Sequence, residues 1–304
     1  MQVESRTTAN TGAEGVSVVI PALNEEGGVT EVVETLLAVL KTSGLAHEVL
    51  VIDDGSSDNT GLAAERAGAR VVRHRVNRGY GAAIKSGMSA AAHDLICITD
   101  ADGTYPSEAI PGLVKAIGDG ADMAVTSRTG ANVSIPLIRR PAKWVIRKMA
   151  EAMAGMSIPD INSGLRVFRR SHAQSFLGIL PDGFSFTTTI TLALLSNGYE
   201  VDYQPIDYGK RVGRSKIRPI RDTLNFAALI LRIALYFAPL KFFLPLSAFL
   251  LAVAVAWALV SKFVLGTLAD VSSVLLVVAA IQVAVVGLLA EMINRRLPGR
   301  YKGS

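Results

Sequence analysis

The chain has 304 residues, half of them apolar, with a formal net charge of +5 and a positive mean hydropathy of +0.37. This length provides for one large or two small domains with a substantial core, and the hydropathy indicates apolar segments beyond that core. The single cysteine, Cys97, excludes an internal disulfide and suits a reducing compartment. The basic residues cluster before the apolar stretches, and few aromatic residues lie among them to stack on bases. This pattern favours a membrane surface over nucleic acid as their partner.

The polar residues 1–14 are expected to form a flexible tail without a signal peptide. From residue 16 to about residue 125, short runs rich in Val and Ile alternate with stretches of helical periodicity. This alternation predicts an α/β fold with a doubly wound, mostly parallel sheet flanked by helices, the first of them over residues 29–40. The predicted strands are Val16–Ile20, Val49–Asp53, Arg70–Arg73, Leu95–Thr99, Met123–Thr126 and Glu200–Ile206.

An acidic triplet, Asp100-Ala101-Asp102, follows the predicted strand Leu95–Thr99. A buried parallel strand would place both carboxylates at the carboxyl edge of the sheet, where ligands of such folds bind. Mg²⁺ and Mn²⁺ take oxygen ligands and often share them between carboxylates and the phosphates of a nucleotide. The triplet therefore predicts a metal and diphosphate site, although two aspartates in this position also cap turns or helices.

Polar motifs also follow the first two strands. Glu25 lies in VVIPALNEEGG, and Asp53 and Asp54 lie in VIDDGSSDNT. These carboxylates can accept hydrogen bonds from a base and from ribose hydroxyls, whereas D-G-S by itself is ordinary turn chemistry. The segment NRGYGAAIKSG then has glycines that permit close backbone approach and a Lys85 that could reach a phosphate.

Two apolar stretches, Phe242–Ser261 and Val271–Ala290, are each about 20 residues long and so suit membrane spans. Two buried helices of a soluble bundle are the alternative, but such helices normally carry a polar face. Lys and Arg flank the pair on the outside, and the turn near Gly266–Asp270 has none, which predicts that both ends face the cytoplasm. The basic stretch before the spans is expected to form amphipathic helices in the membrane interface, with a solvated charged face as the alternative.

Taken together with DADGTYP, SRTG, IPDINSGLRVFRR, FSFTTT and YGKRVGRSK, these motifs resemble family 2 glycosyltransferases of GT-A (Rossmann-like) fold. With the basic interfacial segment and the hairpin, the chain from about residue 16 to residue 296 is similar to the polyprenyl-phosphate branch. Dolichol-phosphate mannose synthase and undecaprenyl-phosphate sugar transferases typify that branch. The resemblance implies an inverting transfer of a single hexose, most readily mannose or glucose, from a nucleotide diphosphate sugar to undecaprenyl or dolichyl phosphate.

The resemblance also implies roles on the donor side. Asp100 and Asp102 would bind Mg²⁺ or Mn²⁺, and Asp102 would be a catalytic residue. Some relatives carry a Gln two residues after the second aspartate, whereas this chain has Thr104, so that water or Thr104 would substitute as a ligand. The residues expected to bind the nucleotide sugar are Pro21, Asn24, Glu25, Asp53, Asp54, Lys85, Asp100 and Ala101.

On the acceptor side, guanidinium groups suit phosphate oxygens because they bind them in pairs. Arg166 and Asp160 are further catalytic candidates: Arg166 could instead anchor its loop to a carboxylate, and Asp160 is a base, a sugar-orienting group or a loop cap. Arg139 could instead serve only the membrane surface. The residues expected to bind the lipid phosphate are Arg128, Arg139, Arg211, Ser215 and Lys216.

The expected domains are a catalytic domain over residues 15–210, interface helices over 211–240, and a transmembrane hairpin with a cytoplasmic tail over 241–304. The protein is thus expected to be integral to the plasma (inner) membrane, with its catalytic domain in the cytoplasm and homo-oligomers possible. The rival hypothesis is a nucleotide-sugar-binding membrane protein without catalysis, acting as a partner or scaffold in glycan export. Both aspartates of the triplet and the complete acceptor-side set argue against that rival.

Overall fold

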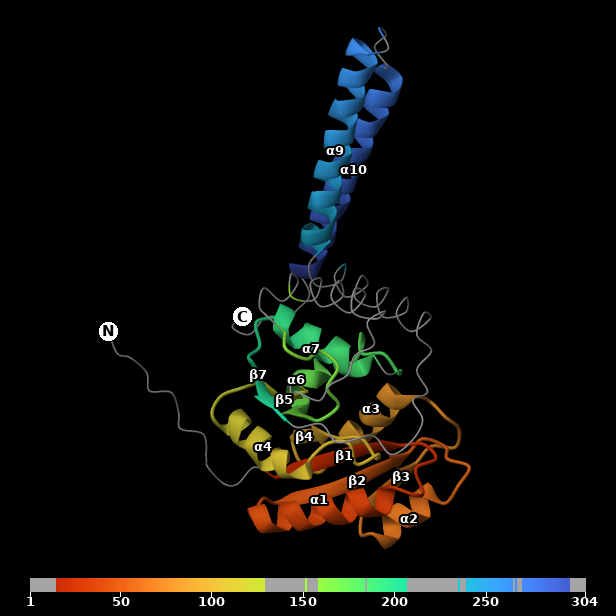
Figure 1. The fold of residues 1–304 in the computed structure, drawn as a ribbon, viewed down its shortest axis with the longest axis vertical. Helices are drawn as coiled ribbons and strands as arrows, with labels where there is room; N and C mark the ends of the chain where they lie inside the picture. The colour runs from red at the N-terminus through yellow and green to blue at the C-terminus, as the bar shows by residue number, and fades with distance from the viewer. Residues whose placement is uncertain are drawn as a thin grey trace, which may run out of the picture. The chain divides into compact units, whose positions relative to one another are not determined.

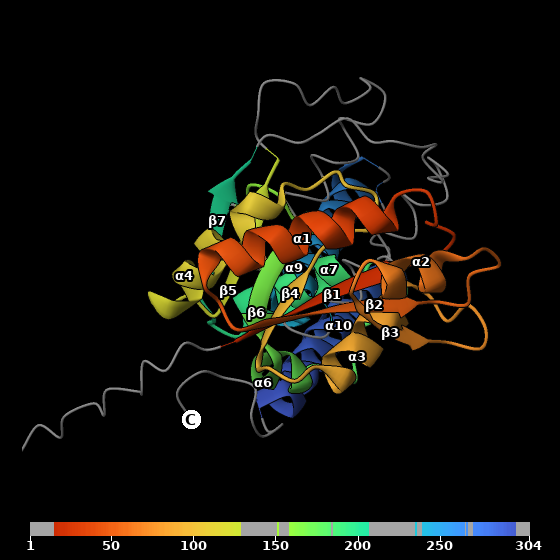
Figure 2. The same cartoon turned by 90° about the horizontal axis from the view of Figure 1, so that it is seen from below.

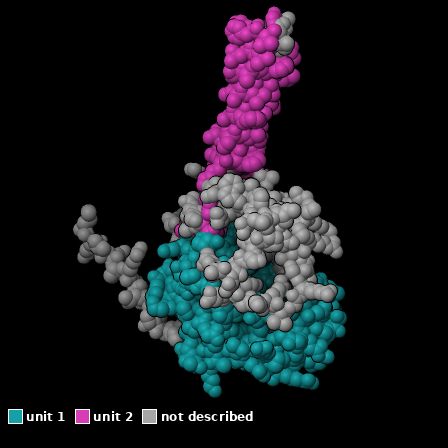
Figure 3. All heavy atoms as spheres, in the orientation of Figure 1, with its two compact units in different colours: residues 1–134, 159–191, 199–216 teal, residues 135–158, 192–198, 217–304 magenta. Residues whose placement is uncertain are grey.

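The computed structural model describes residues 15–128, 151, 158–183, 185–206, 235, 239–264, 266 and 270–295. The chain divides into two compact units, which Figure 3 colours separately. Unit 1 comprises residues 1–134, 159–191 and 199–216, and unit 2 comprises residues 135–158, 192–198 and 217–304. The division is interleaved along the chain, because short segments between residues 135 and 198 group with the C-terminal helices.

Unit 1 is built on a seven-stranded sheet in the order β3-β2-β1-β4-β6-β5-β7. All neighbouring strands are parallel except β6, which runs antiparallel to both β4 and β5. The fold class predicted from the sequence is therefore confirmed. The strands are β1 (Val16–Ala22), β2 (His47–Asp53), β3 (Arg70–Arg73), β4 (Leu95–Ile98), β5 (Met123–Ser127), β6 (Arg166–Arg169) and β7 (Val201–Pro205).

Helices cover both faces of this sheet (Figures 1 and 2). On one face, α1 and α4 bury apolar side chains in the same cluster as alternate residues of β1, such as Val18 and Ile20. On the other face lies α3, where a Cβ added at Gly87 would meet the side chain of Val19 at 2.3 Å, so only glycine fits there. The helices are α1 (Val29–Ser43), α2 (Thr60–Arg66), α3 (Tyr80–Ala90), the 3₁₀ turn η1 (Ser107–Ala109), α4 (Ile110–Gly118), α6 (Arg170–Gln174) and α7 (Phe186–Ser196).

The central strands are apolar throughout because both of their faces are covered. All seven residues of β1 and all four of β4 are buried. Such strands show continuous Val and Ile rather than alternation, which is why the sequence located them well. Cys97 in β4 is fully buried, and burial raises the pKa of its thiol.

Strand β6 was not among the strands predicted from the sequence. The segment Arg166–Arg169 inserts between β4 and β5 with Val167 and Phe168 fully buried. Four residues with a charge at each end give too short a periodic signal to identify a strand from sequence. Its insertion brings the loop before it, Asp160–Leu165, to the carboxyl edge of β4 and β5.

Unit 2 contains two long apolar helices, α9 (Pro239–Phe263) and α10 (Asp270–Arg295). Both are long and apolar enough to cross a membrane, with candidate spans of 25 and 23 residues. They pack against each other in a hairpin (Figure 1). Gly287 brings the α10 backbone so close to Phe243 that a Cβ at this position would lie 2.6 Å from the Phe243 side chain. The two predicted spans therefore correspond to two candidate transmembrane helices.

Candidate functional site

The acidic triplet lies where the sequence placed it, directly after β4. The hydroxyl of Tyr80, the first residue of α3, donates to Asp100 Oδ1 at 3.1 Å. The hydroxyl of Thr104 donates to Asp102 Oδ1 at 2.6 Å, and its backbone N–H donates to the same oxygen at 3.2 Å. Both carboxylates are half-buried and are oriented by hydroxyl donors, whereas Thr104 itself is 2% exposed. Thr104 is thus placed to orient Asp102.

The loop that leads into β6 packs directly against Asp100. The Gly164 N–H donates to the hydroxyl oxygen of Tyr105 at 2.6 Å. A Cβ on Gly164 would lie 2.9 Å from Asp100 Oδ2 and 2.9 Å from the Tyr105 ring, so a glycine is required for this close approach. The sequence analysis quoted this motif but did not identify Gly164 or Tyr105 as site residues, because nothing local shows which chain segments meet.

Tyr80 and Tyr105, which lie beside the triplet, both keep their phenolic protons at neutral pH because their pKa values are raised. Burial, together with the charge of Asp100, raises the pKa of Tyr80 well above its ordinary value. Burial likewise raises the pKa of Tyr105 to about 12. Tyr80 was not predicted as a site residue, and its only sequence signal was its place between two glycines at the start of a helix.

The loops after β1 and β2 are tied together by side-chain hydrogen bonds. The Asn24 side-chain oxygen accepts from the Ser57 N–H at 2.8 Å, and the Glu25 N–H donates to the Thr60 hydroxyl at 2.8 Å. Asn24 has a left-handed φ of 56°, a conformation that Asn tolerates better than most residues. Asn24 and Glu25 keep exposed surface at this edge, whereas Pro21 is buried within β1.

The two aspartates after β2 have different surroundings. Asp53 accepts from the Ser56 N–H at 2.9 Å, and its other oxygen lies 3.9 Å from Arg73. Asp54 accepts three hydrogen bonds, from His74 Nδ1 at 2.6 Å and from the N–H groups of Arg78 and Gly79 at 2.9 and 2.8 Å. Asp54 is 4% exposed, so its carboxylate organises the loop between β3 and α3, and its predicted contact with a nucleoside stays a prediction.

The glycine-rich segment at the start of α3 is occupied by the chain itself. The N–H groups of Gly81 and Ala82 donate to the carbonyl of Asp182 at 2.8 and 3.1 Å. Lys85 forms an ion pair with the Asp182 carboxylate at 2.8 Å. The glycines therefore permit the close approach of a neighbouring loop, since a Cβ at Gly81 would lie 2.1 Å from the Pro181 carbonyl. A phosphate contact by Lys85 stays a prediction and would have to compete with Asp182.

On the acceptor side, Arg128 and Asp160 form a two-pronged ion pair. Arg128 Nε donates to Asp160 Oδ2 at 2.6 Å, and a terminal nitrogen donates to Oδ1 at 3.0 Å. Desolvation acts to raise the pKa of Asp160, but the Arg128 guanidinium and the backbone N–H of Asn162 outweigh it and lower the pKa. A carboxylate with a lowered pKa is a weaker base, which favours the orienting role predicted for Asp160 over proton abstraction.

Arg166 has surroundings that the sequence analysis did not anticipate. Its side chain is fully buried, and it donates to the Thr187 carbonyl and the Thr191 hydroxyl, each at 2.8 Å, and to the Ser163 carbonyl. It therefore anchors the loop before β6 to the first turns of α7 through carbonyl and hydroxyl oxygens, and not through a carboxylate as the alternative supposed. Burial lowers the pKa of this guanidinium, and a catalytic contact by Arg166 stays a prediction.

Four predicted residues of the lipid-phosphate set lie outside the described residues: Arg139, Arg211, Ser215 and Lys216. Among the described residues, Arg128 is the member of that set that the structure places at the sheet edge, next to Asp160.

The donor set at the triplet suits a hard divalent cation. Within the described ranges, no cluster of three or more His, Cys, Asp or Glu is positioned to hold a metal. Asp100 and Asp102 instead offer two carboxylates, the arrangement in which phosphate oxygens and water complete the coordination of Mg²⁺ or Mn²⁺. The site therefore fits a cation that arrives with a diphosphate.

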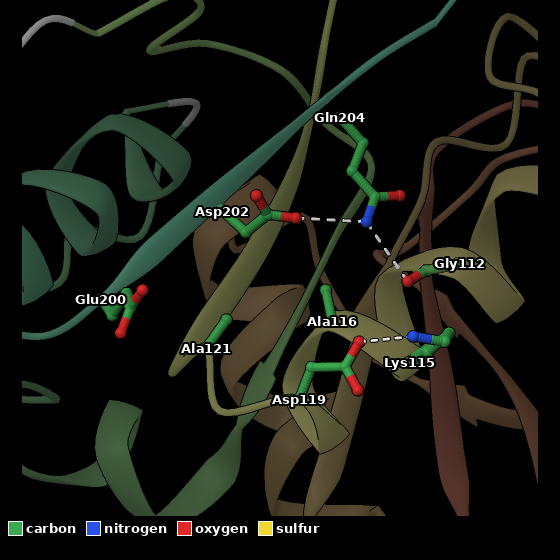
Figure 4. Close-up of a pocket in the computed structure, with 8 residues that line it drawn as sticks. All are labelled: Gly112, Lys115, Ala116, Asp119, Ala121, Glu200, Asp202 and Gln204. Carbon is green, nitrogen blue, oxygen red and sulfur yellow. Dashed lines mark hydrogen bonds and ion pairs between the residues drawn. The ribbon is translucent and has the colours of Figure 1, made fainter.

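A cavity of about 430 Å³ lies elsewhere in unit 1, between α4 and β7 (Figure 4). None of the predicted site residues is among the residues that line it. Its polar groups pair with one another: Lys115 with Asp119 at 2.6 Å, and the Gln204 amide with Asp202 at 3.1 Å. The predicted site residues at the strand ends therefore lie outside this cavity.

Unit 1 thus has a doubly wound sheet with one antiparallel strand and two carboxylates at its carboxyl edge, where α/β proteins of this class bind their ligands. Residues 17–177 match the profile described as glycosyl transferase family 2, and residues 238–295 match the profile described as GtrB C-terminal hairpin. The chain belongs to glycosyl transferase family 2.

Two groups of sequence relatives bear on its activity. An undecaprenyl-phosphate 4-deoxy-4-formamido-L-arabinose transferase of Serratia proteamaculans is 36% identical over 189 residues, covering 57% of each chain. A dolichyl-phosphate hexose transferase of Haloferax volcanii is 29% identical over 221 residues, covering 72% of this chain and 94% of the relative. The chain thus spans little more than half the length of the Serratia relative.

Among solved structures, glucosyl-3-phosphoglycerate synthase from Mycobacterium tuberculosis, in complex with Mn²⁺, UDP-glucose and phosphoglyceric acid, has a TM-score of 0.56. It is 25% identical and covers 73% of this chain and 79% of its own. Its similarity supports the GT-A-like sheet of unit 1.

Proposed function

We propose that this protein transfers one sugar, a hexose such as mannose or glucose, from a nucleotide diphosphate sugar to the phosphate of an undecaprenyl or dolichyl lipid. The proposal includes inversion at the anomeric carbon. It is supported by relatives named as undecaprenyl-phosphate and dolichyl-phosphate sugar transferases. The observation that carries it is one chain that combines a carboxylate pair after β4 with an apolar helical hairpin.

On the donor side, Asp100 and Asp102 would hold Mg²⁺ or Mn²⁺ together with the diphosphate. A bound cation would supply Lewis acidity that stabilises negative charge on the departing nucleotide diphosphate. Tyr80 and Thr104 hold the two carboxylates in place through hydroxyl donors, so little reorganisation is required when the donor binds. A relative structure solved with Mn²⁺ and UDP-glucose supports this choice of cation and donor.

The nucleoside would be bound at the ends of β1 and β2. Asn24, Glu25 and Asp53 would contact it, and Pro21 and Ala101 would line the same site. Asp54 would support these residues indirectly, because it fixes the loop between β3 and α3. Lys85 would reach the donor only after releasing Asp182.

On the acceptor side, the lipid phosphate is already an anion at neutral pH, so it needs positioning more than deprotonation. Arg128 would bind it, and Asp160 would hold Arg128 in place and orient the sugar. Three basic residues, Arg139, Arg211 and Lys216, and the hydroxyl of Ser215 complete the proposed acceptor site on sequence grounds alone.

The hairpin of α9 and α10 would fix this chemistry at the cytoplasmic face of the inner membrane, where prenyl phosphate headgroups lie. Its length and apolarity support the insertion, and the absence of Lys and Arg from the turn supports the orientation. The proposed organisation is a catalytic domain over residues 15–210, interface helices over 211–240 and the hairpin over 241–304.

The proposal is tested with the purified full-length chain in detergent. A panel of nucleotide sugars is incubated with Mg²⁺ or Mn²⁺ and a prenyl phosphate, and nucleotide diphosphate release and glycolipid formation are measured. Release that requires both the cation and the prenyl phosphate is expected with at least one donor. Binding of a nucleotide sugar without release under any combination would contradict transfer and support the non-catalytic alternative.

A further inference from the structure

His74 directly follows β3, and its ring binds two other elements at once. Nδ1 donates to Asp54 Oδ1 at 2.6 Å, and Nε2 lies 2.9 Å from the hydroxyl of Ser86 in the second turn of α3. Because a carboxylate only accepts, Nδ1 carries a proton, and the neutral ring then accepts from the hydroxyl at Nε2. The side chains of His74 and Asp54 are 6% and 5% exposed, so water does not readily replace either contact.

Asp54 in turn fixes the start of α3. It accepts from the N–H group of Gly79 at 2.8 Å, and Gly79 directly precedes Tyr80, the first residue of the helix. On the other side of Tyr80, the Gly81 N–H donates to the Asp182 carbonyl at 2.8 Å. Hydrogen bonds therefore hold the peptide groups on both sides of Tyr80, so the position of α3 sets the direction of its side chain.

Tyr80 connects this arrangement to the acidic triplet, because its hydroxyl donates to Asp100 Oδ1 at 3.1 Å. Ser86 lies six residues further along the same helix, which corresponds to about 9 Å along its axis. His74 thus binds α3 directly at Ser86 and, through Asp54, at its N-terminus. Two separate attachment points fix the orientation of a helix, whereas a single one would let it pivot.

We propose that His74 is a positioning residue for the metal and diphosphate site. It holds α3 in the orientation in which the Tyr80 hydroxyl meets Asp100, so that this carboxylate is preorganised for a cation that arrives with a nucleoside diphosphate. This role rests on the proposed function, which places the cation at Asp100 and Asp102. Through α3, the strand end after β2 is thereby coupled to the strand end after β4.

A role of His74 in stability alone has different consequences. Loss of a purely stabilising contact lowers the unfolding midpoint and the fraction of folded protein, but the folded fraction keeps its affinity for ligands. Loss of a positioning contact changes the affinity itself. It changes the part of the affinity that depends on the cation, because that part requires Asp100 to be correctly oriented.

The test measures binding of UDP and of GDP to the full-length protein in detergent by titration calorimetry, with and without Mn²⁺. The ratio of the two dissociation constants is the gain in affinity that Mn²⁺ supplies. His74→Asn keeps an N–H group that can donate to Asp54 but does not reach Ser86, and it is expected to reduce this gain about threefold to tenfold. Tyr80→Phe removes the hydrogen bond to Asp100 itself and is expected to reduce the gain about 10- to 100-fold.

Combining the two substitutions tests the route through Tyr80. If His74 acts through Tyr80, His74→Asn has no further effect on the gain in a Tyr80→Phe background, whereas independent effects multiply. Ser86→Ala removes only the hydroxyl that links His74 to α3, and it is expected to reduce the gain about twofold to fivefold. It keeps the route testable if His74→Asn does not fold.

His47→Asn is the matched control. His47 lies at the opposite end of β2, and its ring binds the Leu45 carbonyl at 2.7 Å. This variant is expected to keep the full Mn²⁺-dependent gain. A gain that is unchanged in both His74→Asn and Ser86→Ala would overturn the inference, and so would effects of His74→Asn and Tyr80→Phe that multiply.

The same measurement separates this role from sugar transfer. A wild-type protein whose nucleotide affinity does not depend on Mn²⁺ would overturn the role of His74 together with the proposed metal site. A gain that depends on His74 as expected, in a protein that transfers no sugar to prenyl phosphate, would contradict the proposed transfer and leave the role of His74 in place.

Discussion

Aspartates lie at the carboxyl ends of two strands of the same sheet, β2 and β4, which flank β1 on either side, and their surroundings differ. Asp54 after β2 is buried and accepts hydrogen bonds from two backbone N–H groups and from His74. Asp100 and Asp102 after β4 are half-buried, and hydroxyl groups of Tyr80 and Thr104 orient them. Aspartates at corresponding strand ends therefore differ: Asp54 stabilises the loop before α3, whereas Asp100 and Asp102 are partly exposed, as the proposed metal and diphosphate site requires.

The largest effect is expected from Asp102→Asn, since it removes a charge where the cation and diphosphate would bind. Transfer should fall by about 100-fold or more, because electrostatic stabilisation of the leaving group is lost. Nucleotide diphosphate release measures the loss, and the thermal unfolding midpoint should stay near that of wild type.

Asp119→Asn is the matched control for Asp102→Asn. Asp119 is exposed, and its ion pair with Lys115 of α4 lies at the surface and so contributes little to stability. It should keep full activity. Undiminished transfer by Asp102→Asn would remove the triplet from the proposed site.

Asp54→Ala should act on stability first. Its loss leaves the N–H groups of Arg78 and Gly79 and the His74 ring without their buried acceptor, which is expected to cost about 3 kcal/mol of unfolding free energy. Denaturant unfolding monitored by circular dichroism provides the measurement.

Asp53→Ala serves as the comparison, with an expected loss of about 1 kcal/mol, since Asp53 accepts one close backbone hydrogen bond. If Asp54→Ala retained wild-type stability and lost only binding of the nucleotide sugar, the distinction between Asp54 and the triplet aspartates would be wrong.

Gly164→Ala, in the loop before β6, tests whether the position of the Asp100 carboxylate matters. The added Cβ would meet Asp100 Oδ2 and the Tyr105 ring at 2.9 Å, so that the carboxylate must shift. Transfer is expected to fall about tenfold, with a loss of about 1–3 kcal/mol in stability from overpacking. Gly118→Ala in α4 has open space around its Cβ and should change neither quantity adversely. A fully active Gly164→Ala variant would show that the position of Asp100 is not critical.

The smallest effect is expected from Asp160→Asn, and it should depend on pH. The pKa of Asp160 is lowered in the folded state, so its ion pair with Arg128 stabilises the protein above the unfolded pKa of about 3.9. That contribution is lost as the pH falls through the lower folded pKa.

At pH 7, Asp160→Asn should therefore reduce the unfolding free energy by about 1–2 kcal/mol, and the difference from wild type should vanish in strong acid. Unfolding curves collected from pH 7 down to about pH 1, well below the ordinary carboxyl pKa of about 3.9, provide the check. A difference that grows as the pH falls would contradict the lowered pKa.

The strands and the hairpin could be predicted because their signals are local. β3 was located to the residue, and the apolar runs of β1 and β4 were recognised because both of their faces are covered. Strand β6 was missed because four residues do not establish a period. The site residues Tyr80, Tyr105 and Gly164 were missed for another reason, since each acts on a partner at least 20 residues away in the chain.

The sequence by itself determined the α/β class, the acidic triplet at a strand end and the two apolar helices, because residue types and their spacing suffice for these. The tertiary structure alone decided which carboxylates are hydrogen-bonded within the protein, since that depends on donors from distant segments, such as the N–H groups that donate to Asp54. It also decided that Arg166 is buried, because the direction of a side chain follows from packing and not from its identity.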